Sequence, residues 1–515
     1  MLNNIKTITM YLPQYHQIPE NDEWWGKGYT DWVAVKSAEK YFDEQIQPRI
    51  PMDNNYYDLS KAETLRWQAD LMKKYNVYGQ CFYHYYFKEG RKILEKPAEL
   101  LLQNKDIDMP FCFCWANDPW ARSWSKIKNT NQWAEKFEVS GEKKILLEQE
   151  YGDEYDWDKH FEYLKDFFLD ERYIKIDGKP LFIIYRPEGI DCISEMIQYF
   201  NNKIREYGIS EICFWGANIS TPMESLQAAI YIHASSYFNL DVTGMCLEEK
   251  RINDVKTYGY DDVWANILNS NPVQGMKTYF GGIVDQDDTP RRGRLGFCLT
   301  GVTPEKFRKY IYELALKNMK SGNEFLFIDA WNEWGEGNYL EPDKKNKFKY
   351  LESIRDVMQE CNFLTHIDDL QIEHQNNNAD RKEVIKKYKK YKKYYEILDG
   401  WMLLKENGIS VYSYFQSRGY NKIAIYGFMS LGSHLLRELQ NTNIEVMVVI
   451  DKRSELKNPN INIISPNEQI PKLDAIIITP VYDFNSIKDK LKNKTEAKIV
   501  SIEEVINECI LTLNI

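Results

Sequence analysis

Eight short apolar or aromatic runs recur along the first two-thirds of the chain, and this repetition limits the possible folds more than any other feature. The runs are Thr7–Tyr15, Val77–Tyr86, Pro110–Ala116, Leu181–Arg186, Glu211–Ala217, Ala228–Ala234, Lys277–Val284 and Glu324–Asp329. Helical patterns separate several of them, at Leu59–Tyr75, Tyr155–Asp170, Ser194–Tyr207 and Pro304–Asn318. Strands that alternate with helices pair in parallel through right-handed crossovers. Eight such units predict an α/β fold of the (β/α)8 TIM-barrel type, with a doubly wound open sheet as the alternative.

The ends of these runs are rich in polar and aromatic residues. In a parallel barrel the carboxyl ends of all strands meet at one face, and that face carries the active site. This placement favours the barrel over the open sheet and predicts substrate contacts at the strand ends. Any one residue alone is explained as well by a loop or a satisfied core position, and His84 is the clearest such case. The predicted contacts are Tyr15, His16, Tyr83, His84, Trp115, Asn117, Arg186, Asn218 and Asn332.

The eighth run leads into a loop that holds two glutamates three positions apart, Glu333 and Glu336. Glycines break this loop, and Trp331 and Trp334 flank the acids. A tight turn can aim both carboxylates into one cleft, and two carboxyl groups in different environments are what glycosidic chemistry uses. For an arbitrary pair at this spacing, two solvated loop acids would be the better explanation. The strand-end position and the aromatic faces, which are platforms for sugar rings, favour a catalytic pair here.

The composition narrows the class of protein further. The 515 residues are too many for a single core, so we expect two domains or more. The 36 Tyr and 14 Trp indicate an aromatic-lined cleft, and the net charge of −11 argues against nucleic acid as a partner. The nine Cys are scattered, and Cys112-x-Cys114 lacks a second pair. We therefore expect a reducing compartment, no metal site and no cofactor.

Two further features concern membranes. The N-terminal residues lack the apolar segment of a signal peptide, and no apolar run approaches the roughly 18 residues of a membrane-spanning helix. We therefore expect a cytoplasmic protein. Residues 366–400 have the composition of a linker and an exposed helix, with a Lys-rich segment at 386–393. This segment is either a solvated helix face or a peripheral docking surface for an anionic membrane.

The last 115 residues, 401–515, are typical of a small Rossmann-like α/β domain. Strand patterns lie at Lys422–Tyr426, Glu445–Ile450, Ala475–Thr479 and Lys498–Ser501. Gly427 and Gly432 enclose a turn into a helix whose N-terminus can hold a phosphate, and Asp451 stands where a ribose-binding acid would. The G-x-G-x-x-G core and the Lys of a P-loop are absent from this turn. Nucleotide binding therefore competes with a structural or partner-binding role.

Several ordered motifs between residues 5 and 355 resemble the WbsX family. They include Tyr11–His16, Pro19–Trp32, Tyr83–Tyr85, Cys114–Asn117, Thr289–Arg291 and Trp331–Gly337. Members of that family are described as glycosyltransferases of O-antigen and capsule loci, and their barrel resembles the endo-α-1,2-mannosidases of glycoside hydrolase family 99. The resemblance does not reach the C-terminal domain. It adds Trp25, Arg291, Trp331 and Trp334, which lie in these motifs, to the predicted substrate contacts.

In the hydrolase family a loop with the pattern E-W-x-E carries both catalytic carboxylates, and the four residues from Glu333 to Glu336 match it one by one. The resemblance implies that Glu333 deprotonates the sugar 2-hydroxyl, which attacks C1 and forms an anhydro-sugar intermediate. Glu336 would protonate the leaving oxygen and later activate the acceptor, so that configuration is retained. Departures from the family pattern lie in the loops at Glu44–Pro48, Ala116–Trp120 and Gln286–Asp288, and they leave the substrate more open than the chemistry.

The sequence therefore predicts a carbohydrate-active enzyme that acts with retention on a bacterial surface polysaccharide or its precursor. Hydrolysis and transfer both stay open, because they differ only in what attacks the intermediate. The alternatives are a nucleotide-sugar-dependent transferase whose C-terminal domain holds the donor, and a non-catalytic glycan-binding scaffold. The expected domains are a barrel over residues 1–365, a linker helix over 366–400 and a small domain over 401–515. The sequence does not determine the sugar, the linkage or the oligomeric state.

Overall fold

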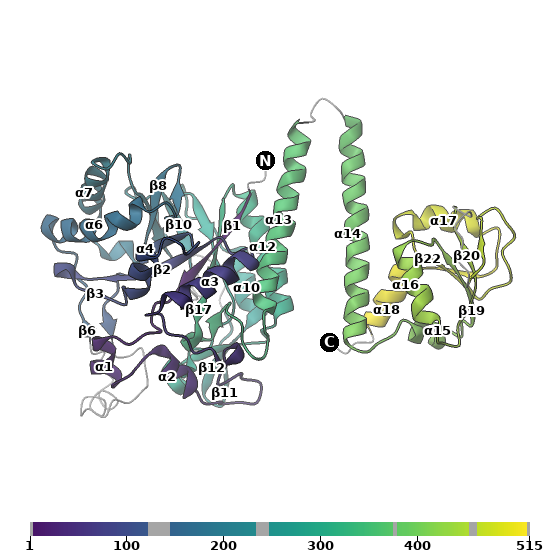
Figure 1. The fold of residues 1–515 in the computed structure, drawn as a ribbon, viewed down its shortest axis with the longest axis horizontal. Helices are drawn as coiled ribbons and strands as arrows, with labels where there is room; N and C mark the ends of the chain where they lie inside the picture. Colours follow the sequence, from purple (N-terminus) through teal and green to yellow (C-terminus); the bar gives the residue numbers. More distant parts are fainter. Residues whose placement is uncertain (1–3, 122–144, 233–246, 374–377, 453–460, 512–515) are drawn as a thin grey trace. The chain divides into compact units, whose positions relative to one another are not determined.

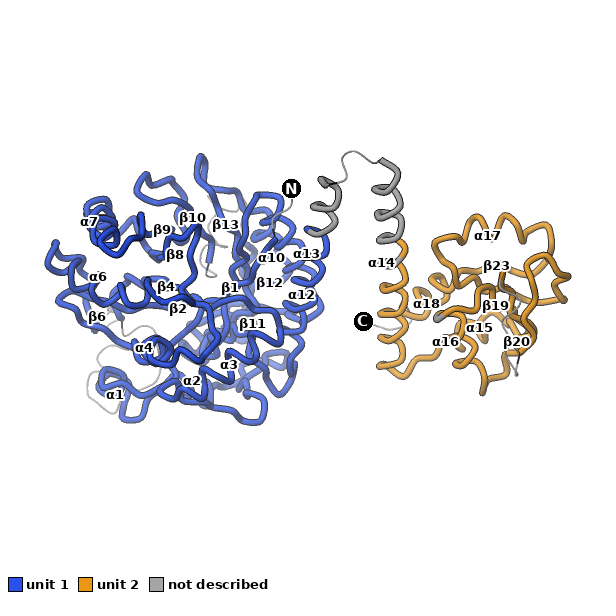
Figure 2. The backbone as a smooth tube through the Cα atoms, turned by 45° about the horizontal axis from the view of Figure 1, so that its top comes forward, with its two compact units in different colours: residues 1–369 blue, residues 370–515 orange. Residues whose placement is uncertain are grey.

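The computed structural model describes residues 4–121, 145–232, 247–373, 378–452 and 461–511. Within these ranges only the backbone is described for residues 121, 366–389, 391–392 and 430. The chain divides into two compact units, residues 1–369 and 370–515, coloured separately in Figure 2. Across the described ranges, no helix has both the length and the apolar character needed to span a bilayer.

The first unit is built on parallel strands in the order β13-β10-β9-β8-β4-β2-β1-β16-β14. The strands β13 and β14 are separated by the single residue Gly281, so the path almost returns to its start and forms a nearly closed barrel of nine strands. A Cβ at Gly281 would lie 2.1 Å from the carbonyl oxygen of Tyr231, which explains the glycine at this junction. The strands are β1 (Lys6–Tyr11), β2 (Gly79–Tyr86), β4 (Phe111–Trp115), β8 (Lys179–Ile184), β9 (Cys213–Ala217), β10 (Ala228–Tyr231), β13 (Thr278–Phe280), β14 (Gly282–Ile283) and β16 (Phe325–Asp329).

Each of the eight predicted runs overlaps a strand of this barrel, and the seventh run is divided between β13 and β14. Residues 233 and 234 of the sixth predicted run lie outside the described residues. The strands are buried along almost their whole length, as expected for parallel strands with side chains packed on both faces.

Helices cover the outside of the barrel in Figure 1. They are α3 (Ala62–Lys74), α4 (Lys96–Gln103), α6 (Glu154–Leu169), α7 (Ile193–Arg205), α10 (Tyr260–Asn269), α12 (Pro304–Lys320) and α13 (Lys349–Glu373). The four predicted helices correspond to α3, α6, α7 and α12. Asp153 caps α6 by accepting a hydrogen bond from the amide of Tyr155, and Thr303 caps α12 with Pro304 at its first turn.

Alternation along the strands decides which side chains reach the inside of the barrel. Phe113 of β4 packs on Phe167 of α6, with ring centroids 5.0 Å apart, so it faces the helices. Trp215 of β9 instead lies 6.0 Å from Phe327 of β16, inside the barrel. Asp329 shares the face of Phe327 because it follows two positions later on β16, so it points inward at the carboxyl end.

Short elements at the carboxyl end of the barrel build the site. They are α1 (Pro19–Trp25), α2 (Asp31–Lys36), α11 (Thr289–Arg292), β17 (Asn332–Glu333), the 3-10 turn η6 (Trp334–Glu336) and β18 (Asn338–Tyr339). The strands β17 and β18 form a small antiparallel pair in which Asn332 is opposite Tyr339 and Glu333 is opposite Asn338. A further sheet of β11 (Lys250–Ile252), β12 (Val255–Gly259) and β15 (Phe297–Thr300) lies in the same unit.

The second unit contains five parallel strands in the order β21-β20-β19-β22-β23. They are β19 (Lys422–Tyr426), β20 (Glu445–Ile450), β21 (Ile463–Ile464), β22 (Ala475–Ile478) and β23 (Lys498–Ser501), and only β21 was not predicted. The helices are α14 (Asn378–Glu406), α15 (Tyr412–Arg418), α16 (Ser430–Leu439), α17 (Phe484–Leu491) and α18 (Ile502–Leu511). The Lys-rich segment 386–393 belongs to α14, and most of its side chains lie outside those described, so membrane docking stays a prediction.

Candidate active site

The loop after β16 is fixed to the first strand of the barrel by Asn332. Its Oδ1 accepts from the amide of Leu12 (2.8 Å) and its Nδ2 donates to the carbonyl of Leu12 (2.9 Å). The hydroxyl of Tyr15 lies 2.6 Å from the carbonyl oxygen of Asn332 and accepts from the amide of Trp334 (3.0 Å). These contacts hold the backbone on both sides of Glu333, so the carboxyl group starts from a rigid position.

A buried acid, Glu341, holds the two tryptophans of the loop. It accepts hydrogen bonds from Nε1 of Trp331 (2.9 Å) and from Nε1 of Trp334 (2.7 Å). Tyr57 and Gln68 donate to the same carboxylate, each at 2.8 Å. Burial raises the pKa of Glu341 to about 7, although these four hydrogen bonds act to lower it. Both indoles are therefore buried loop anchors, and their predicted role as sugar platforms is wrong.

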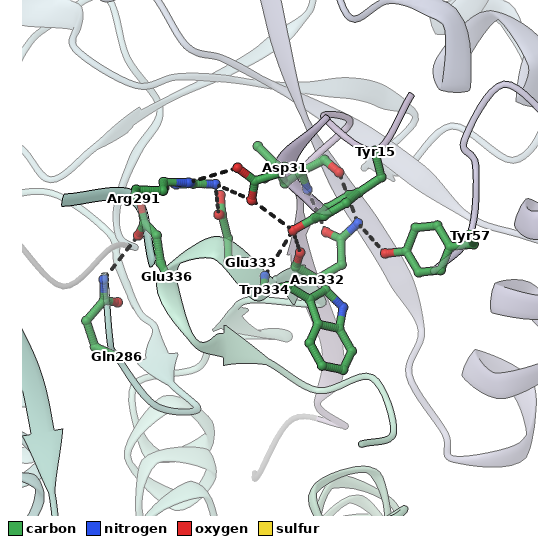
Figure 3. Close-up of polar contacts among 10 residues, drawn as sticks. Tyr15, Asp31, Tyr57, Gln286, Arg291, Asn332, Glu333, Trp334 and Glu336 are labelled. Carbon is green, nitrogen blue, oxygen red and sulfur yellow. Dashed lines mark hydrogen bonds and ion pairs between the residues drawn. The ribbon is translucent and has the colours of Figure 1, made fainter. Parts of the chain in front are cut away.

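Glu333 and Glu336 meet on one guanidinium, as Figure 3 shows. Arg291 donates from Nη2 to Glu333 Oε2 (2.9 Å) and from Nη1 to Glu336 Oε1 (2.6 Å). Gln286 donates to the other oxygen of Glu336 at 3.1 Å. The loop pattern E-W-x-E thus places both carboxyl groups at one point of the barrel mouth, and α11 supplies the cation between them.

Arg291 is itself held by Asp31 at the start of α2. Its Nε donates to Asp31 Oδ1 (3.1 Å) and its Nη2 to Asp31 Oδ2 (3.0 Å), and the hydroxyl of Tyr15 lies 3.3 Å from that second oxygen. Gly335 makes room for this ion pair, because a Cβ there would lie 2.3 Å from Asp31 Oδ2 and 2.6 Å from Arg291 Nε. The glycine between the two glutamates is therefore required by the packing of the pair that orients them.

These groups line a pocket of about 260 Å³ at the carboxyl end of the barrel. Its walls combine six aromatic side chains with acids and arginines, the mixture that a sugar-binding cleft needs for ring stacking and hydroxyl contacts. The lining residues are Leu12, Gln14, Trp25, Tyr29, Asp31, Tyr83, Tyr85, Ala116, Asp118, Trp120, Tyr185, Arg186, Arg291, Arg292, Glu333 and Glu336.

The two catalytic candidates differ in environment. The side chain of Glu333 is 9% exposed and that of Glu336 is 22% exposed. Burial raises the pKa of Glu333 well above its ordinary value; Arg291 opposes this shift, and the charges of Glu336, Asp31 and Asp329 add to it. Burial, together with the charge of Glu336, also raises the pKa of Asp329 to about 8. Burial therefore favours the protonated forms of Glu333 and Asp329.

Six of the predicted site residues line this pocket: Glu333, Glu336, Trp25, Tyr83, Arg186 and Arg291. The sequence reasoning missed Asp31 and Tyr85, which also line it. Asp31 lies inside the motif Pro19–Trp32, and Tyr85 lies two positions after Tyr83 on the same face of β2. The sequence contained a signal for each residue: Asp31 occupies a motif position, and Tyr85 follows Tyr83 by two positions on a strand.

His84 and Trp115 were predicted as sugar contacts, and the structure places both against α6. His84 Nε2 lies 2.9 Å from His160 Nε2, and burial lowers the pKa of His84 to about 3. Trp115 packs on the same His160 ring (4.9 Å between centroids), while its Nε1 donates to the carbonyl of Tyr86. The physical reason is strand alternation: the neighbours of an inward residue point outward.

Four other predicted contacts hydrogen-bond the backbone, and a fifth, His16, is buried. Tyr15 and Asn332 anchor the loop after β16. Asn117 joins the loops after β4 and β8 through the amide and the carbonyl of Arg186 (2.8 and 2.9 Å). Asn218, at φ 56°, accepts from the amide of Ile232. His16 is buried, which lowers its pKa to about 4. None of the five is among the residues that line the pocket within the described ranges.

In the second unit the three predicted nucleotide-binding residues come together at the carboxyl ends of β19 and β20. Asp451 Oδ2 accepts from the amide of Phe428 (2.7 Å), directly after Gly427 at φ +94°. A Cβ at Gly432 would lie 2.0 Å from the carbonyl oxygen of Gly427, so α16 packs tightly on the turn. Across the part of the chain that the structure describes, no group of three or more His, Cys, Asp or Glu side chains is arranged to hold a metal ion.

An α/β barrel that presents two carboxyl groups over an arginine in an aromatic pocket has the layout of a carbohydrate-active enzyme. The profile of the family described as "Glycosyltransferase WbsX" matches residues 7–354, and the chain belongs to this family. The uncharacterized protein WxcX of Xanthomonas campestris pv. campestris strain B100 is 29% identical over 361 residues, 68% of this chain and 49% of the relative. The same protein in a second strain is 28% identical over 369 residues, with the same two shares. The chain thus spans about half the length of the curated relatives it matches.

The chain is also similar to solved structures. The GH99 endo-α-mannosidase of Bacteroides thetaiotaomicron, in complex with bis-tris-propane, is 16% identical, with a TM-score of 0.40, over 71% of this chain and 99% of that one. A protein titled "Glycoside hydrolase-like protein" is 8% identical, with a TM-score of 0.44, over 69% of this chain and 94% of that one. Membership in the WbsX family rests on the match over residues 7–354.

Proposed function

We propose that this protein acts with retention on a glycosidic bond of a bacterial surface polysaccharide, such as an O-antigen or a capsule, or of its precursor. The reaction is hydrolysis or transfer to a second sugar, and the substrate is an oligosaccharide or polysaccharide. The observation that carries the proposal is the meeting of Glu333 and Glu336 on Arg291 in the aromatic pocket at the barrel mouth. Family membership supports the same class of chemistry.

The proposed steps follow the roles that the family 99 resemblance implies. Glu333 takes the proton of the sugar 2-hydroxyl, O2 attacks C1, and the bond from C1 to the leaving oxygen breaks as that oxygen takes a proton from Glu336. Glu336 then takes the proton of water or of an acceptor hydroxyl, whose oxygen attacks C1. The bond between O2 and C1 breaks, and O2 recovers a proton from Glu333. Two inversions at C1 give overall retention.

The experiment that tests the proposal is a crystal soak of Glu333→Gln with short α-mannosides and other surface-glycan fragments. The expected result is a sugar whose C1 lies between residues 333 and 336. Product analysis with the unaltered protein then separates free sugar from a transfer product. A barrel pocket that stays empty with every fragment, in a protein that shows no turnover of them, contradicts the proposal. A bound sugar with unchanged function in Glu333→Gln supports the glycan-binding scaffold instead.

The second candidate is a transferase that binds a nucleotide sugar in residues 401–515, treated as a Rossmann-like domain. One observation favours it: when the strands of the second unit are numbered along the chain, their order is 3-2-1-4-5, which matches five of the six strands in the doubly wound dinucleotide-binding order 3-2-1-4-5-6. Gly427 and Asp451 lie after the first and second of these strands. Calorimetry with UDP-, GDP- and dTDP-sugars separates the candidates. Heat that disappears on deletion of residues 401–515 supports the transferase, and no heat with any donor excludes it.

A further inference from the structure

Three carboxyl groups converge on Arg291, and only two of them belong to the proposed catalytic pair. Its Nε and Nη2 make a two-point contact with Asp31, Nη2 also donates to Glu333, and Nη1 donates to Glu336. These contacts use four of the five N–H groups that a guanidinium offers. Planar two-point contacts are the strongest form of this pairing, so Asp31 has the firmest hold on the cation.

The charges in this cluster do not balance. The side chain of Asp31 is 1% exposed and that of Arg291 is 14% exposed, so water screens little of their charge. Three ionised acids against one guanidinium would leave a net charge of −2 in a buried site, and such an excess is relieved by binding a proton. Because Asp31 is paired at two points, the proton falls to the two glutamates.

We infer that Asp31 is a positioning residue that, by occupying Arg291, keeps one proton on the Glu333–Glu336 pair. This inference rests on the proposed function, because a retaining mechanism needs one protonated and one ionised carboxyl group at the start. If the charge of Asp31 is removed, the whole charge of Arg291 acts on the two glutamates and favours loss of that proton. Asp31 is then necessary for catalysis although it transfers no proton itself.

Other titratable groups face the same pair, and each plays a smaller part. Burial raises the pKa of Asp329, below the pair on β16, to about 8, so it carries little charge at pH 7. Burial also raises the pKa values of Tyr15, Tyr83 and Tyr85, which stay neutral. Burial raises the pKa of Asp288 to about 7 against the opposing charge of Arg292. Asp31 differs from all of these because it contacts Arg291 directly.

The test is a pH titration of the full chain labelled with 13C at the glutamate carboxyl carbons. The signals of residues 333 and 336 are identified by their loss in Glu333→Gln and Glu336→Gln. In Asp31→Asn we expect the apparent pKa values of the pair to fall by about 1 unit or more, and in Asp31→Glu to stay close to those of the unaltered protein. Asp70→Asn, at an exposed position on α3, is the charge-matched control. An unchanged titration in a folded Asp31→Asn protein overturns the inference.

A second variant changes the charge around the two glutamates in the opposite direction. Arg291→Gln removes the cation, so we expect the apparent pKa values of the pair to rise, with the opposite sign to Asp31→Asn. A merely structural role for Asp31 predicts no fall in Asp31→Asn. If Asp31→Asn does not fold, the double variant Asp31→Asn/Arg291→Gln, which leaves neither charge without its partner, decides the question: the apparent pKa values of the pair should lie below those in Arg291→Gln, and equal values overturn the inference. These titrations need no turnover. If the protein acts on no glycan, the proposed function fails while the proton inference is still decided; if it is active and the titrations do not move, only the inference fails.

Discussion

The barrel and the C-terminal unit both place glycines and acids at the carboxyl ends of parallel strands, yet they use them in opposite ways. In the barrel, Glu333, Glu336 and Asp31 compete for one guanidinium, so the site holds more charge than it can satisfy internally. In the C-terminal unit, the carboxylate of Asp451 accepts the amide of Phe428 and closes the turn on itself. The end of a parallel strand is thus a position where a site can lie. An excess of carboxyl groups over the cations and amides that can pair with them distinguishes the candidate active site from a closed turn.

The sharpest test of this comparison removes the proposed acid in the barrel. We expect Glu336→Gln to lower turnover of substrates with poor leaving groups by about 10²–10⁴-fold, because general acid help is lost. Substrates with good leaving groups need less protonation and should lose less. Steady-state kinetics on a matched pair of substrates measures the difference. Glu313→Gln, at an exposed position on α12, is the control, and equal rates in Glu336→Gln and Glu313→Gln would refute the assignment.

A second test uses the buried acid below the pair. Asp329 has its pKa raised to about 8 in the folded protein, against an ordinary 3.8 in the unfolded chain. Its contribution to stability is therefore fully present below pH about 4 and is lost as the pH rises through about 8. We expect the free energy of unfolding of the barrel to fall over that window by on the order of 6 kcal/mol, and Asp329→Asn to flatten the fall.

Denaturant unfolding at about pH 5, about pH 7 and about pH 9 measures how the free energy of unfolding changes with pH. The control is Asp70→Asn, which removes an exposed acid from α3 and should leave the slope in place. The prediction is contradicted if the stability of the barrel does not decline between about pH 5 and about pH 9, or if Asp329→Asn leaves the slope unchanged.

A smaller effect is expected from Asn332, which anchors the loop after β16. Asn332→Asp keeps the shape of the side chain but replaces the Nδ2 donor by an acceptor that faces the carbonyl of Leu12. We expect a loss of about 2–3 kcal/mol in stability, since a buried acceptor is left unpaired, and a drop in turnover because Glu333 is the next residue. Thermal unfolding and kinetics measure the two effects. In Asn407→Asp, an exposed substitution in the second unit, both should stay near their starting values.

The sequence was sufficient to predict the barrel because the signal for each strand is local. The length and the continuous apolar character of each run lie within the run itself. A strand that is buried on both faces can therefore be recognised without knowing which strand it pairs with. That Glu333 and Glu336 share one pocket was predictable for a similar reason, since they lie three residues apart on one loop. The apolar runs did not show which side chains at a strand end point into the barrel and which point toward the helices. Tyr83 and His84 both stand at the end of β2, and one of them lines the pocket while the other meets His160, 76 residues away.

The contacts that support the site were hidden because the two partners of each contact come from distant segments. Glu341 follows the loop with no pattern of its own, and its role appears only when Tyr57, Gln68 and the two indoles reach it. Asp31 is separated from Arg291 by 260 positions, so no local period connects them. Such contacts form only when the barrel brings distant segments together, and a single sequence does not show which distant segments meet.

The smallest expected effect lies in the C-terminal unit and decides what its glycine turn is for. If Asp451 serves the turn alone, Asp451→Asn keeps an acceptor for the amide of Phe428 and costs about 1 kcal/mol of stability in that unit. Turnover at the barrel pocket should then stay within a factor of about two, a change of less than 1 kcal/mol. If the unit holds a nucleotide-sugar donor, the same substitution weakens donor binding and lowers turnover with it. Kinetics with and without added nucleotide sugar therefore shows whether the two strand-end sites act in one reaction or only share one chain.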